Sequence, residues 1–447
     1  MKKIKQSMNI NVEYLTRVEG HGNIVVNVKE GRLQECRLDI VESPRFFEGI
    51  LRGRSIFEAQ HITSRICGIC ACGHSLASIQ AAEDALGIAP SAQTVKLRKL
   101  LLHMEILDSH ILHIYLLAAP DLLGVKSFIP LIETHNKVVR RALRMKKACN
   151  DVCGVLVGRH VHPISAIVGG FTKLPKQKDL NAMHNTLTGM RPDMEATIDL
   201  ISKLKFPEFE RDTEYVALVN DGNEYPLLAG DIGSTDGVRM NKREYRKATN
   251  EFIVPHSSAK HTKLSRESYA VGALARFNLN YEKLHPNAKE TASVLGMKPK
   301  CINPYLNTAA QLIESAHCLE DAVAIIEDFQ NSGIDYSEEI TVGLNEQKKI
   351  PVKAGNGVGA VEVPRGILYH NYEIDENGVI VNADCIIPTN QNLNNIERDM
   401  HKLVPELLSQ NHAKSEEEVT LALEMLVRAY DPCISCSTHM IKVGFVC

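Results

Sequence analysis

Two cysteine pairs are the residues whose type and spacing could support metal or redox chemistry. Cys67 and Cys70 lie in the segment RICGIC, and Cys433 and Cys436 lie in the segment DPCISC. A Cys-x-x-Cys spacing lets two thiolates converge on one metal, especially in a turn where a helix begins, and a helix N-terminus also favours the thiolate form. Gly68 gives the first pair the backbone freedom that such a turn needs.

Spacing alone leaves three interpretations of these pairs open. A structural zinc ion takes four thiolates, but zinc ribbons usually place their pairs about 15–20 residues apart. Here the pairs lie near opposite ends of a chain of 447 residues. An iron–sulfur or other transition-metal site is the second interpretation, because soft thiolates suit nickel, iron and zinc alike. Two unrelated redox dithiols are the third.

The composition narrows the class of protein. With 44% hydrophobic residues, 23% charged residues and a net charge of -3, the chain has no basic excess that would favour nucleic acid or an anionic membrane. Residues 1–11 have neither the apolar core of a secretory signal nor paired arginines. The apolar stretch 100–119 carries charged residues and histidines, so we expect a buried helix rather than a membrane span. We therefore expect a cytoplasmic protein whose twelve cysteines stay reduced.

Hydrophobic periodicity predicts a mainly α chain with small β-sheets, of the α+β class, forming one domain over residues 1–447. Alternating residues predict strands at 9–18 and 22–40, with a hairpin turn at 29–31. The segment 206–235 is expected to form loops and short strands, and 341–388 to be rich in strands. Helical spacing predicts helices at 69–86, 92–123, 132–156, 179–204, 242–252, 308–332 and 394–431.

The residues around the cysteines resemble the two signatures of nickel–iron hydrogenase large subunits. RICGIC is followed by His74, and the second signature reads DPCISCSTH. Any one short motif is weak support, but many motifs in the expected order are specific, and they span nearly the whole chain. The resemblance implies the large-subunit fold of that family, with a central helical bundle. The further matching pieces, in order, are RVEGHGNI (17–24), PRFFEG (44–49), SHILHIY (109–115), GRHVHPISAIVGG (158–170), EVPRG (362–366) and IIPTNQN (386–392).

The resemblance implies a nickel–iron centre on the four cysteines. All four would bind nickel, Cys70 and Cys436 would also bridge to iron, and Cys67 and Cys433 would be terminal ligands. The iron would carry cyanide and carbon monoxide ligands. Soft, charged sulfur ligands stabilise a redox-active metal, and an open position must remain for the substrate.

The same resemblance implies that Glu19, Arg365 and Cys433 are catalytic. Glu19 matches a proton-transfer glutamate, since a carboxyl group beside the Cys433 thiolate can take its proton and pass it on. Arg365 matches an arginine poised over the open metal position, although its high pKa makes a role as base demanding. Asp431 would hold the Arg365 side chain or cap a turn. The alternatives are an exposed hairpin glutamate and an arginine in a surface salt bridge.

A second, hard metal ion is also implied, either magnesium or a second iron. Its protein ligands would be the side chains of Glu48 and His439 and the backbone carbonyl of Cys385, a set that suits an octahedral ion with added waters. Family precursors are cut after the histidine that matches His439, so residues 440–447 would be a propeptide released by a maturation protease. The alternative is that this tail stays and packs as a short strand.

One position departs from part of the family. Many members have Asp immediately before the first histidine of SHILHIY, where this chain has Ser109, and Asp108 lies about 100° away around a helix. In carrying serine here, the chain resembles the cytoplasmic, multi-subunit branch of the family. The α subunits of that branch belong to two types of hydrogenase: methyl viologen-reducing enzymes, which do not reduce deazaflavin, and deazaflavin-reducing enzymes. We favour the type that does not reduce deazaflavin.

The implied activity is reversible heterolytic cleavage of dihydrogen. The cysteines outside the two pairs form no cluster-binding run, so the electrons need two partners, an iron–sulfur small subunit together with a further electron-transfer subunit. Two alternatives from other classes are a non-catalytic scaffold stapled by zinc and a hydrogen sensor with slow turnover. Metal analysis would separate the first from a hydrogenase, and turnover assays would separate the second.

Overall fold

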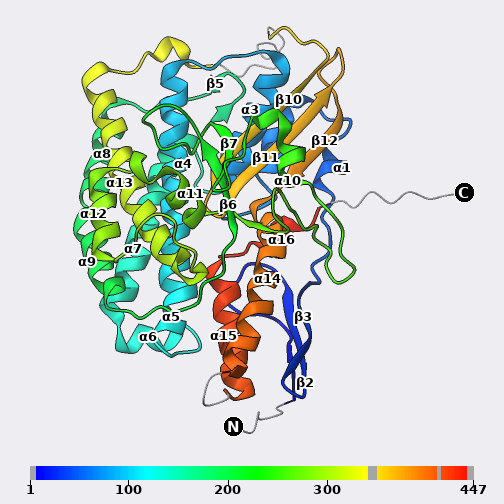
Figure 1. Cartoon of the computed structure of the whole chain (residues 1–447). Helices are drawn as coiled ribbons and strands as arrows, with labels where there is room; N and C mark the ends of the chain where they lie inside the picture. Colours follow the sequence, from blue (N-terminus) through cyan, green and yellow to red (C-terminus); the bar gives the residue numbers. More distant parts are fainter. Residues whose placement is uncertain (1–6, 341–349, 410–413, 440–447) are drawn as a thin grey trace, which may run out of the picture.

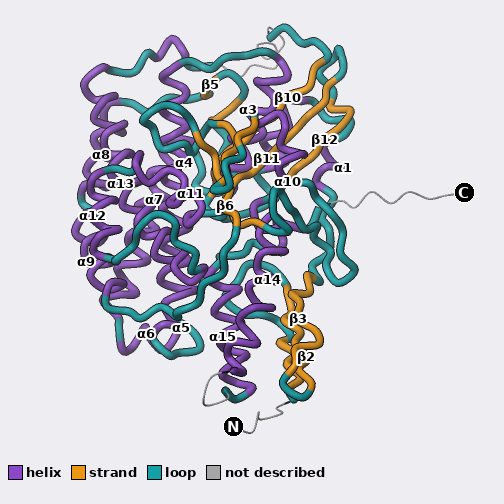
Figure 2. The backbone as a smooth tube through the Cα atoms, viewed as in Figure 1, coloured by secondary structure: helices purple, strands orange, loops and turns teal. Residues whose placement is uncertain are grey.

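The computed structural model describes residues 7–340, 350–409 and 414–439. Helices fill one side of the molecule, while a small sheet and the helix α3 (Ala71–Leu86) lie on the other (Figures 1 and 2). The sheet formed by the N-terminal strands lies beside α14 (Pro388–Ser409) and α15 (Glu416–Ala429), near the N-terminus (Figure 1). The predicted tail 440–447 lies outside the described residues.

Three long helices form the centre of the helical side (Figure 1): α4 (Ala92–Leu112), α7 (Asn136–Val157) and α13 (Asn307–Ser332). The helix α4 continues through a π-helical stretch into α5, so Ala92–Leu122 is long and apolar enough to cross a bilayer by length and composition alone. However, 78% of its most apolar part is buried inside the protein. This burial agrees with the predicted core helix, because a buried core helix can be as long and as apolar as a membrane span.

The N-terminal sheet has the order β1–β2–β3, with β1 at Met8–Val12, β2 at Gly22–Lys29 and β3 at Arg32–Ile40, all antiparallel. The predicted hairpin turn is present, and both Glu30 and Gly31 have positive φ there. The prediction of a first strand over 9–18 was too long. It ends at Val12 because the chain then enters left-handed conformations that interrupt a strand.

A second antiparallel sheet, β10–β11–β12, occupies the region predicted to be rich in strands, of which 341–349 lies outside the described residues. Its strands are Gly355–Val363, Gly366–Ile374 and Ile380–Ile386. The helix α3 (Ala71–Leu86) packs directly on β10. A Cβ atom added at Gly359 would lie 2.0 Å from the Ala77 carbonyl oxygen, and one at Gly357 2.1 Å from that of Ala81. These glycines therefore let the helix and strand backbones meet.

Several predicted helices are divided in the structure. The prediction of one helix over 179–204 is wrong, because the chain breaks near Gly189 and Pro192 starts the next helix. The predicted helix 242–252 is reduced to five residues, and 394–431 contains two helices. The long helix α14 (Pro388–Ser409) starts earlier than predicted. The other helices are α1 (Phe47–Leu51), α2 (Ala59–Thr63), α5 (Ala119–Leu122), α6 (Ile129–Thr134), α8 (Gln177–Thr188), α9 (Arg191–Ser202), α10 (Tyr245–Thr249), α11 (Ala273–Asn280), α12 (Pro286–Val294), α15 (Glu416–Ala429) and α16 (Ile434–Ser437).

The remaining strands are short and lie in the middle of the chain. A four-stranded sheet has the order β8–β7–β6–β9, and β4 pairs with β5. The predicted loops and short strands of 206–235 correspond to β6 and β7 with their connections. The bounds are β4 (Ala166–Ile167), β5 (Gly170–Phe171), β6 (Glu214–Val219), β7 (Asp231–Ser234), β8 (Arg239–Met240) and β9 (Tyr269–Ala270).

Candidate metal centre

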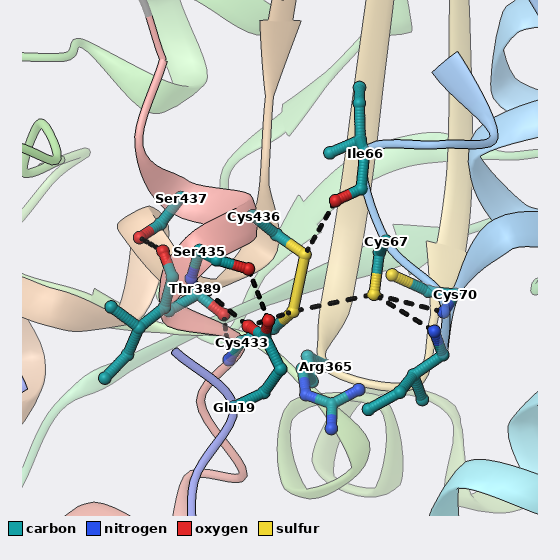
Figure 3. Close-up of a disulfide and its surroundings, with 12 residues drawn as sticks. Glu19, Ile66, Cys67, Cys70, Arg365, Thr389, Cys433, Ser435, Cys436 and Ser437 are labelled. Atoms are coloured by element: carbon teal, nitrogen blue, oxygen red, sulfur yellow. Dashed lines mark hydrogen bonds between the residues drawn. A yellow bond between two sulfur atoms is a disulfide. The ribbon is translucent and has the colours of Figure 1, made fainter. Parts of the chain in front are cut away.

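The fold brings the two cysteine pairs to one buried point (Figure 3). The sulfur atoms of Cys67 and Cys433, which are 366 residues apart in the chain, lie 3.6 Å from each other. The sulfurs of Cys67, Cys70 and Cys436 all lie within 4.8 Å of one another. All four side chains are at most 5% exposed. Such a group of sulfur atoms matches the donor set of a soft transition metal.

The first pair is positioned by local structure. Cys70 is the N-cap residue of α3, and the Cys67 sulfur accepts hydrogen bonds of 3.3 Å from the backbone N–H groups of Ile69 and Cys70. The hydrogen bond from the Cys70 thiol lowers the pKa of Cys67 to about 7 against the effect of burial, and the Arg365 guanidinium acts in the same direction. Cys67 is therefore the thiolate of this pair near neutral pH.

A buried glutamate supports the start of α3 from the neighbouring helix α4. Glu105 accepts hydrogen bonds from the backbone N–H groups of Cys72, at 2.6 Å, and Gly73, at 2.9 Å. These donors belong to the first turn of the helix, where no intrahelical acceptor exists. Burial raises the pKa of Glu105 to about 8, although both backbone hydrogen bonds oppose the shift.

The second pair is positioned by distant parts of the chain. Cys433 precedes the four-residue helix α16, and its backbone N–H donates to Thr389 Oγ1 on α14 at 2.9 Å. In this structure Cys433 and Cys436 are joined by a disulfide. Neither sulfur of a disulfide carries the charge of a metal ligand, so metal binding requires the dithiolate that forms on reduction by two electrons.

The segment around Glu19 pairs with the chain just before and after Cys433. The Ile434 N–H donates to the Glu19 carbonyl at 2.8 Å, and the Glu19 N–H donates to the Pro432 carbonyl at 3.4 Å. Gly20 has φ +84°, and a Cβ there would lie 2.5 Å from the Ser435 nitrogen. This close approach requires glycine, and it fixes the N-terminal segment against the second cysteine pair.

The Glu19 carboxyl group lies against the candidate centre (Figure 3). Its Oε2 atom is 3.1 Å from the Cys433 sulfur and accepts a 3.1 Å hydrogen bond from the Ser435 N–H. The Ser435 hydroxyl also donates to its Oε1 atom. The half-buried carboxyl group is therefore held with one oxygen within reach of a thiol proton.

Arg365 is a buried cation beside the four sulfurs, only 4% exposed (Figure 3). Its Nη2 donates to Asp431 Oδ1 at 2.7 Å and its Nε to the Asp431 carbonyl at 2.5 Å, while Nη1 donates to Ser109 Oγ at 3.3 Å. Gln311 donates in turn to Asp431 at 3.1 Å. Asp431 thus holds the arginine side chain and does not act as a turn cap alone.

The neighbouring aspartate on α4 does not replace Ser109. Asp108 accepts a 2.6 Å hydrogen bond from the Lys146 ammonium group on α7, whereas Arg365 bonds Ser109, as the helical rotation between the two positions predicts. The serine therefore contributes a neutral contact to the arginine where a carboxylate would have added a second negative charge.

The three residues expected to hold a hard metal ion are also buried. The Glu48 carboxylate on α1 accepts a 2.8 Å hydrogen bond from the Cys385 N–H on β12, and burial raises the pKa of Glu48 to about 7. Within the described residues, neither ring nitrogen of His439 has a hydrogen-bond partner. A buried imidazole without partners suits a metal ligand. Asp384 acts electrostatically on both Glu48 and His439, which places the two side chains in one neighbourhood.

Sequence reasoning missed four supporting residues. Thr389 lies in the matched segment IIPTNQN and Ser435 lies between the paired cysteines, so their segments were noticed but not their roles. Gln311 and Glu105 carry no local signal, because each acts on a residue that is distant in sequence.

Known proteins match this chain over nearly its full length. A family described as nickel-dependent hydrogenase matches residues 45–138 and 234–439, and a HoxL-like family matches residues 9–43. The alpha chain of sulfhydrogenase 1 from Pyrococcus furiosus is 32% identical over 97% of this chain and 98% of its own length. A vhu-type F420-non-reducing hydrogenase chain from Methanocaldococcus jannaschii is 31% identical over 87% of this chain and 97% of its own.

Solved structures agree with the sequence matches. A chain of NAD+-reducing [NiFe]-hydrogenase in the H2-reduced state superposes with a TM-score of 0.84 at 27% identity, covering 97% of this chain and 99% of that one. A nickel–iron–selenium hydrogenase from D. vulgaris Hildenborough has a TM-score of 0.72 at 22% identity, which shows the shared fold. With its two cysteine pairs converging as described, this chain belongs to the nickel-dependent hydrogenase family and has its large-subunit fold.

Proposed function

We propose that Cys67, Cys70, Cys433 and Cys436 hold the nickel–iron centre of a hydrogenase that cleaves dihydrogen heterolytically and reversibly. The observation that carries this proposal is the meeting of two cysteine pairs from opposite ends of the chain, with 3.6 Å between Cys67 and Cys433 sulfurs. When bound, the centre supplies the Lewis acidity and the redox change by which dihydrogen yields two protons and two electrons.

The chain supplies a proton acceptor at this centre. As a reduced thiol, Cys433 carries its proton 3.1 Å from Glu19 Oε2, which is hydrogen-bond distance for a sulfur donor. Ser435 fixes the carboxyl group through its N–H and its hydroxyl, so the acceptor oxygen stays on the sulfur. We infer that Glu19 takes the proton from Cys433 and passes it outward.

Arg365 supplies a fixed positive charge in a buried site. Its contacts with Asp431 and Ser109 use all three kinds of guanidinium nitrogen and leave it little freedom to move. A preorganised cation stabilises charge that develops as a bond is split. We therefore assign Arg365 to polarising the substrate rather than to accepting a proton.

The finer features of the centre are part of the same proposal. Cys70 and Cys436 would bridge nickel and iron, Cys67 and Cys433 would bind nickel alone, and the iron would carry cyanide and carbon monoxide. Glu48, His439 and the Cys385 carbonyl would hold magnesium or a second iron, which is supported by the His439 ring having no partner among the described residues.

The electrons need a route that the described residues do not offer. Outside the two pairs, the cysteines of the described segments form no group of three with metal-ligand spacing. The relatives are, by name, single components of hydrogenases built from several chains. We infer two kinds of partner, an iron–sulfur small subunit together with a further electron-transfer subunit. A cytoplasmic location and removal of 440–447 by a maturation protease stay predictions.

Metal analysis with infrared spectroscopy of the purified complex tests the proposal. We expect nickel and iron in the protein, infrared bands from diatomic ligands on iron, and hydrogen-dependent reduction of a viologen dye. Zinc in place of nickel, without those bands, would identify a non-catalytic scaffold. Nickel with the bands but negligible dye reduction would identify a hydrogen sensor.

A further inference from the structure

A third group of potential metal ligands lies apart from the residues assigned above. His256, His261 and Glu397 each place a ligand atom within 4.8 Å of the other two. Both histidines come from the connection after α10, and Glu397 lies on α14. None of the three takes part in the proposed hydrogenase chemistry.

His261 is a buried histidine with one ring nitrogen that lacks a hydrogen bond within the described residues. Its side chain is 1% exposed, and its Nε2 atom has no hydrogen-bond partner among the residues that the structure describes. Native proteins seldom bury a polar nitrogen in this way unless water or an ion completes it. Burial and the neighbouring His256 lower the pKa of His261 to about 4, so the ring is neutral and keeps a lone pair free for a metal.

The ligands are held in place by contacts of their own. Glu397 Oε1 lies 2.7 Å from His256 Nε2 and accepts a 3.0 Å hydrogen bond from the Leu38 N–H on β3. These contacts leave the second oxygen of the carboxylate for another partner. His261 is fixed through its backbone, which exchanges two 2.9 Å hydrogen bonds with Phe252.

A cavity of about 420 Å³ opens beside the three residues and is lined by His261 and Glu397. His401, one helical turn after Glu397 on α14, lines the same cavity and is exposed. The cavity can therefore supply a water molecule or, after a side-chain rotation, the His401 imidazole as a fourth ligand.

The charges around the cavity indicate which kind of ion fits. Lys263 and Arg398 line it, with Arg398 paired to Glu267 at 3.2 Å and Lys263 lying 5.9 Å from the centre of the Phe252 ring. The wall therefore offers no excess of negative charge. Magnesium and calcium prefer several oxygen ligands, whereas directional imidazole nitrogens suit zinc, copper and nickel.

We propose that His256, His261 and Glu397 bind one divalent transition-metal ion of the zinc class. Two imidazoles, one carboxylate and a fourth ligand from the cavity match four-coordinate zinc. Ligand atoms of tetrahedral zinc are roughly 3.4 Å apart, so side chains already within 4.8 Å need only a small movement. The ion would join the 250–262 connection to α14. The first turn of α14 contains Thr389, which accepts the hydrogen bond from the Cys433 N–H.

Zinc analysis of the purified hydrogenase complex tests this site. We expect about one zinc per chain in addition to nickel. After a chelator removes the zinc, added Co2+ should give visible bands of four-coordinate cobalt without a sulfur charge-transfer band, because the ligands are nitrogen and oxygen. A wild-type complex with no zinc and no cobalt bands would overturn the proposal, whether or not any variant folds.

Two variants and one matched control locate the ion. His261→Gln and Glu397→Gln should weaken zinc binding by at least about 100-fold, since even the hydrogen-bond partners of metal ligands contribute about 10–100-fold. His184→Gln removes the histidine of an exposed pair with Glu327, at 3.0 Å, and should leave the zinc content unchanged. Equal zinc loss in all three variants would overturn the assignment. Nickel content and dye reduction, measured on the same samples, report the hydrogenase centre separately.

Discussion

The two cysteine pairs share one spacing but are held in place by different means. Cys67 and Cys70 precede the sixteen-residue helix α3, and the backbone N–H groups of Ile69 and Cys70 donate to the Cys67 sulfur. Cys433 precedes a helix of only four residues, and Cys436 lies within it. Their position depends on hydrogen bonds from segments near residues 19 and 389, which are far away in sequence.

This difference shows that the same motif can be a local structure or a tertiary one. A long helix with a capped first turn defines the direction of its N-terminal residues by itself. A four-residue helix has almost no stability of its own, so packing decides where its cysteines point. Changes near the second pair should therefore alter the site more than their local contacts suggest, whereas changes near α3 should act mainly through stability.

The largest effect is expected from Arg365→Lys, at the point where both pairs meet. Lysine keeps the charge but cannot reproduce the paired contacts with Asp431 and Ser109. Loss of one preorganised donor typically costs about 10²–10³ in rate, so hydrogen-dependent dye reduction should fall by that factor while nickel remains bound.

Arg98→Lys is the matched control for this change. Arg98 is equally buried and bonds Glu83 through two nitrogens, at 2.8 and 2.6 Å, away from the sulfurs. The Arg98→Lys variant should lose thermal stability but keep its turnover per bound nickel. If the two variants lose activity alike, Arg365 is structural and the proposed polarising role is wrong.

Glu105→Gln tests how the carboxyl group that supports the first cysteine pair affects the pH dependence of stability. The pKa of Glu105 is raised from 4.5 to about 8, so the native state keeps a proton that the unfolded chain releases. The wild type should therefore lose stability between about pH 4.5 and pH 8, by at most about 1.4 kcal/mol per pH unit. Relative to it, the variant should gain about 3.5 kcal/mol from pH 5 to pH 8. A stability difference that does not change with pH would mean that the carboxylate is ionised throughout.

Gly20→Ala tests the backbone contact that positions the second pair. The added Cβ would lie 2.5 Å from the Ser435 nitrogen at a φ of +84°. Gly53→Ala is the control, because Gly53 has a φ of +80° with nothing within 4 Å of an added Cβ. Backbone strain should cost both variants about 1 kcal/mol, but Gly20→Ala should lose a further ~1–3 kcal/mol from overpacking and a larger share of its hydrogen-dependent dye reduction. Equal loss in both variants would contradict a role for this close approach.

The smallest effect is expected from Thr389→Val, which removes the acceptor for the Cys433 N–H without changing side-chain size. An unsatisfied buried N–H costs about 1–3 kcal/mol, which should lower the thermal unfolding temperature and cut dye reduction by up to about tenfold. Thr389→Ser keeps the hydroxyl and should restore most of both. A serine variant as impaired as the valine variant would show that packing, not the hydrogen bond, matters here.

The sequence by itself determined the elements with a strong local pattern. The N-terminal hairpin, the helix after Cys70 and the three-stranded sheet after residue 355 follow from alternation, helical spacing and turn residues, which act between near neighbours. The family motifs also predicted the site residues, namely the two cysteine pairs, Glu19, Glu48 and Arg365. Breaks in long helices, as at Gly189, were missed because periodicity continues across them.

Only the tertiary structure decided how the site is assembled. No local pattern could place Cys67 3.6 Å from Cys433, assign Glu105 to the first turn of α3, or set Thr389 beneath the second pair. These contacts join residues separated by 33 to 366 positions. They exist because burial of a common core outweighs the entropy of closing such long loops.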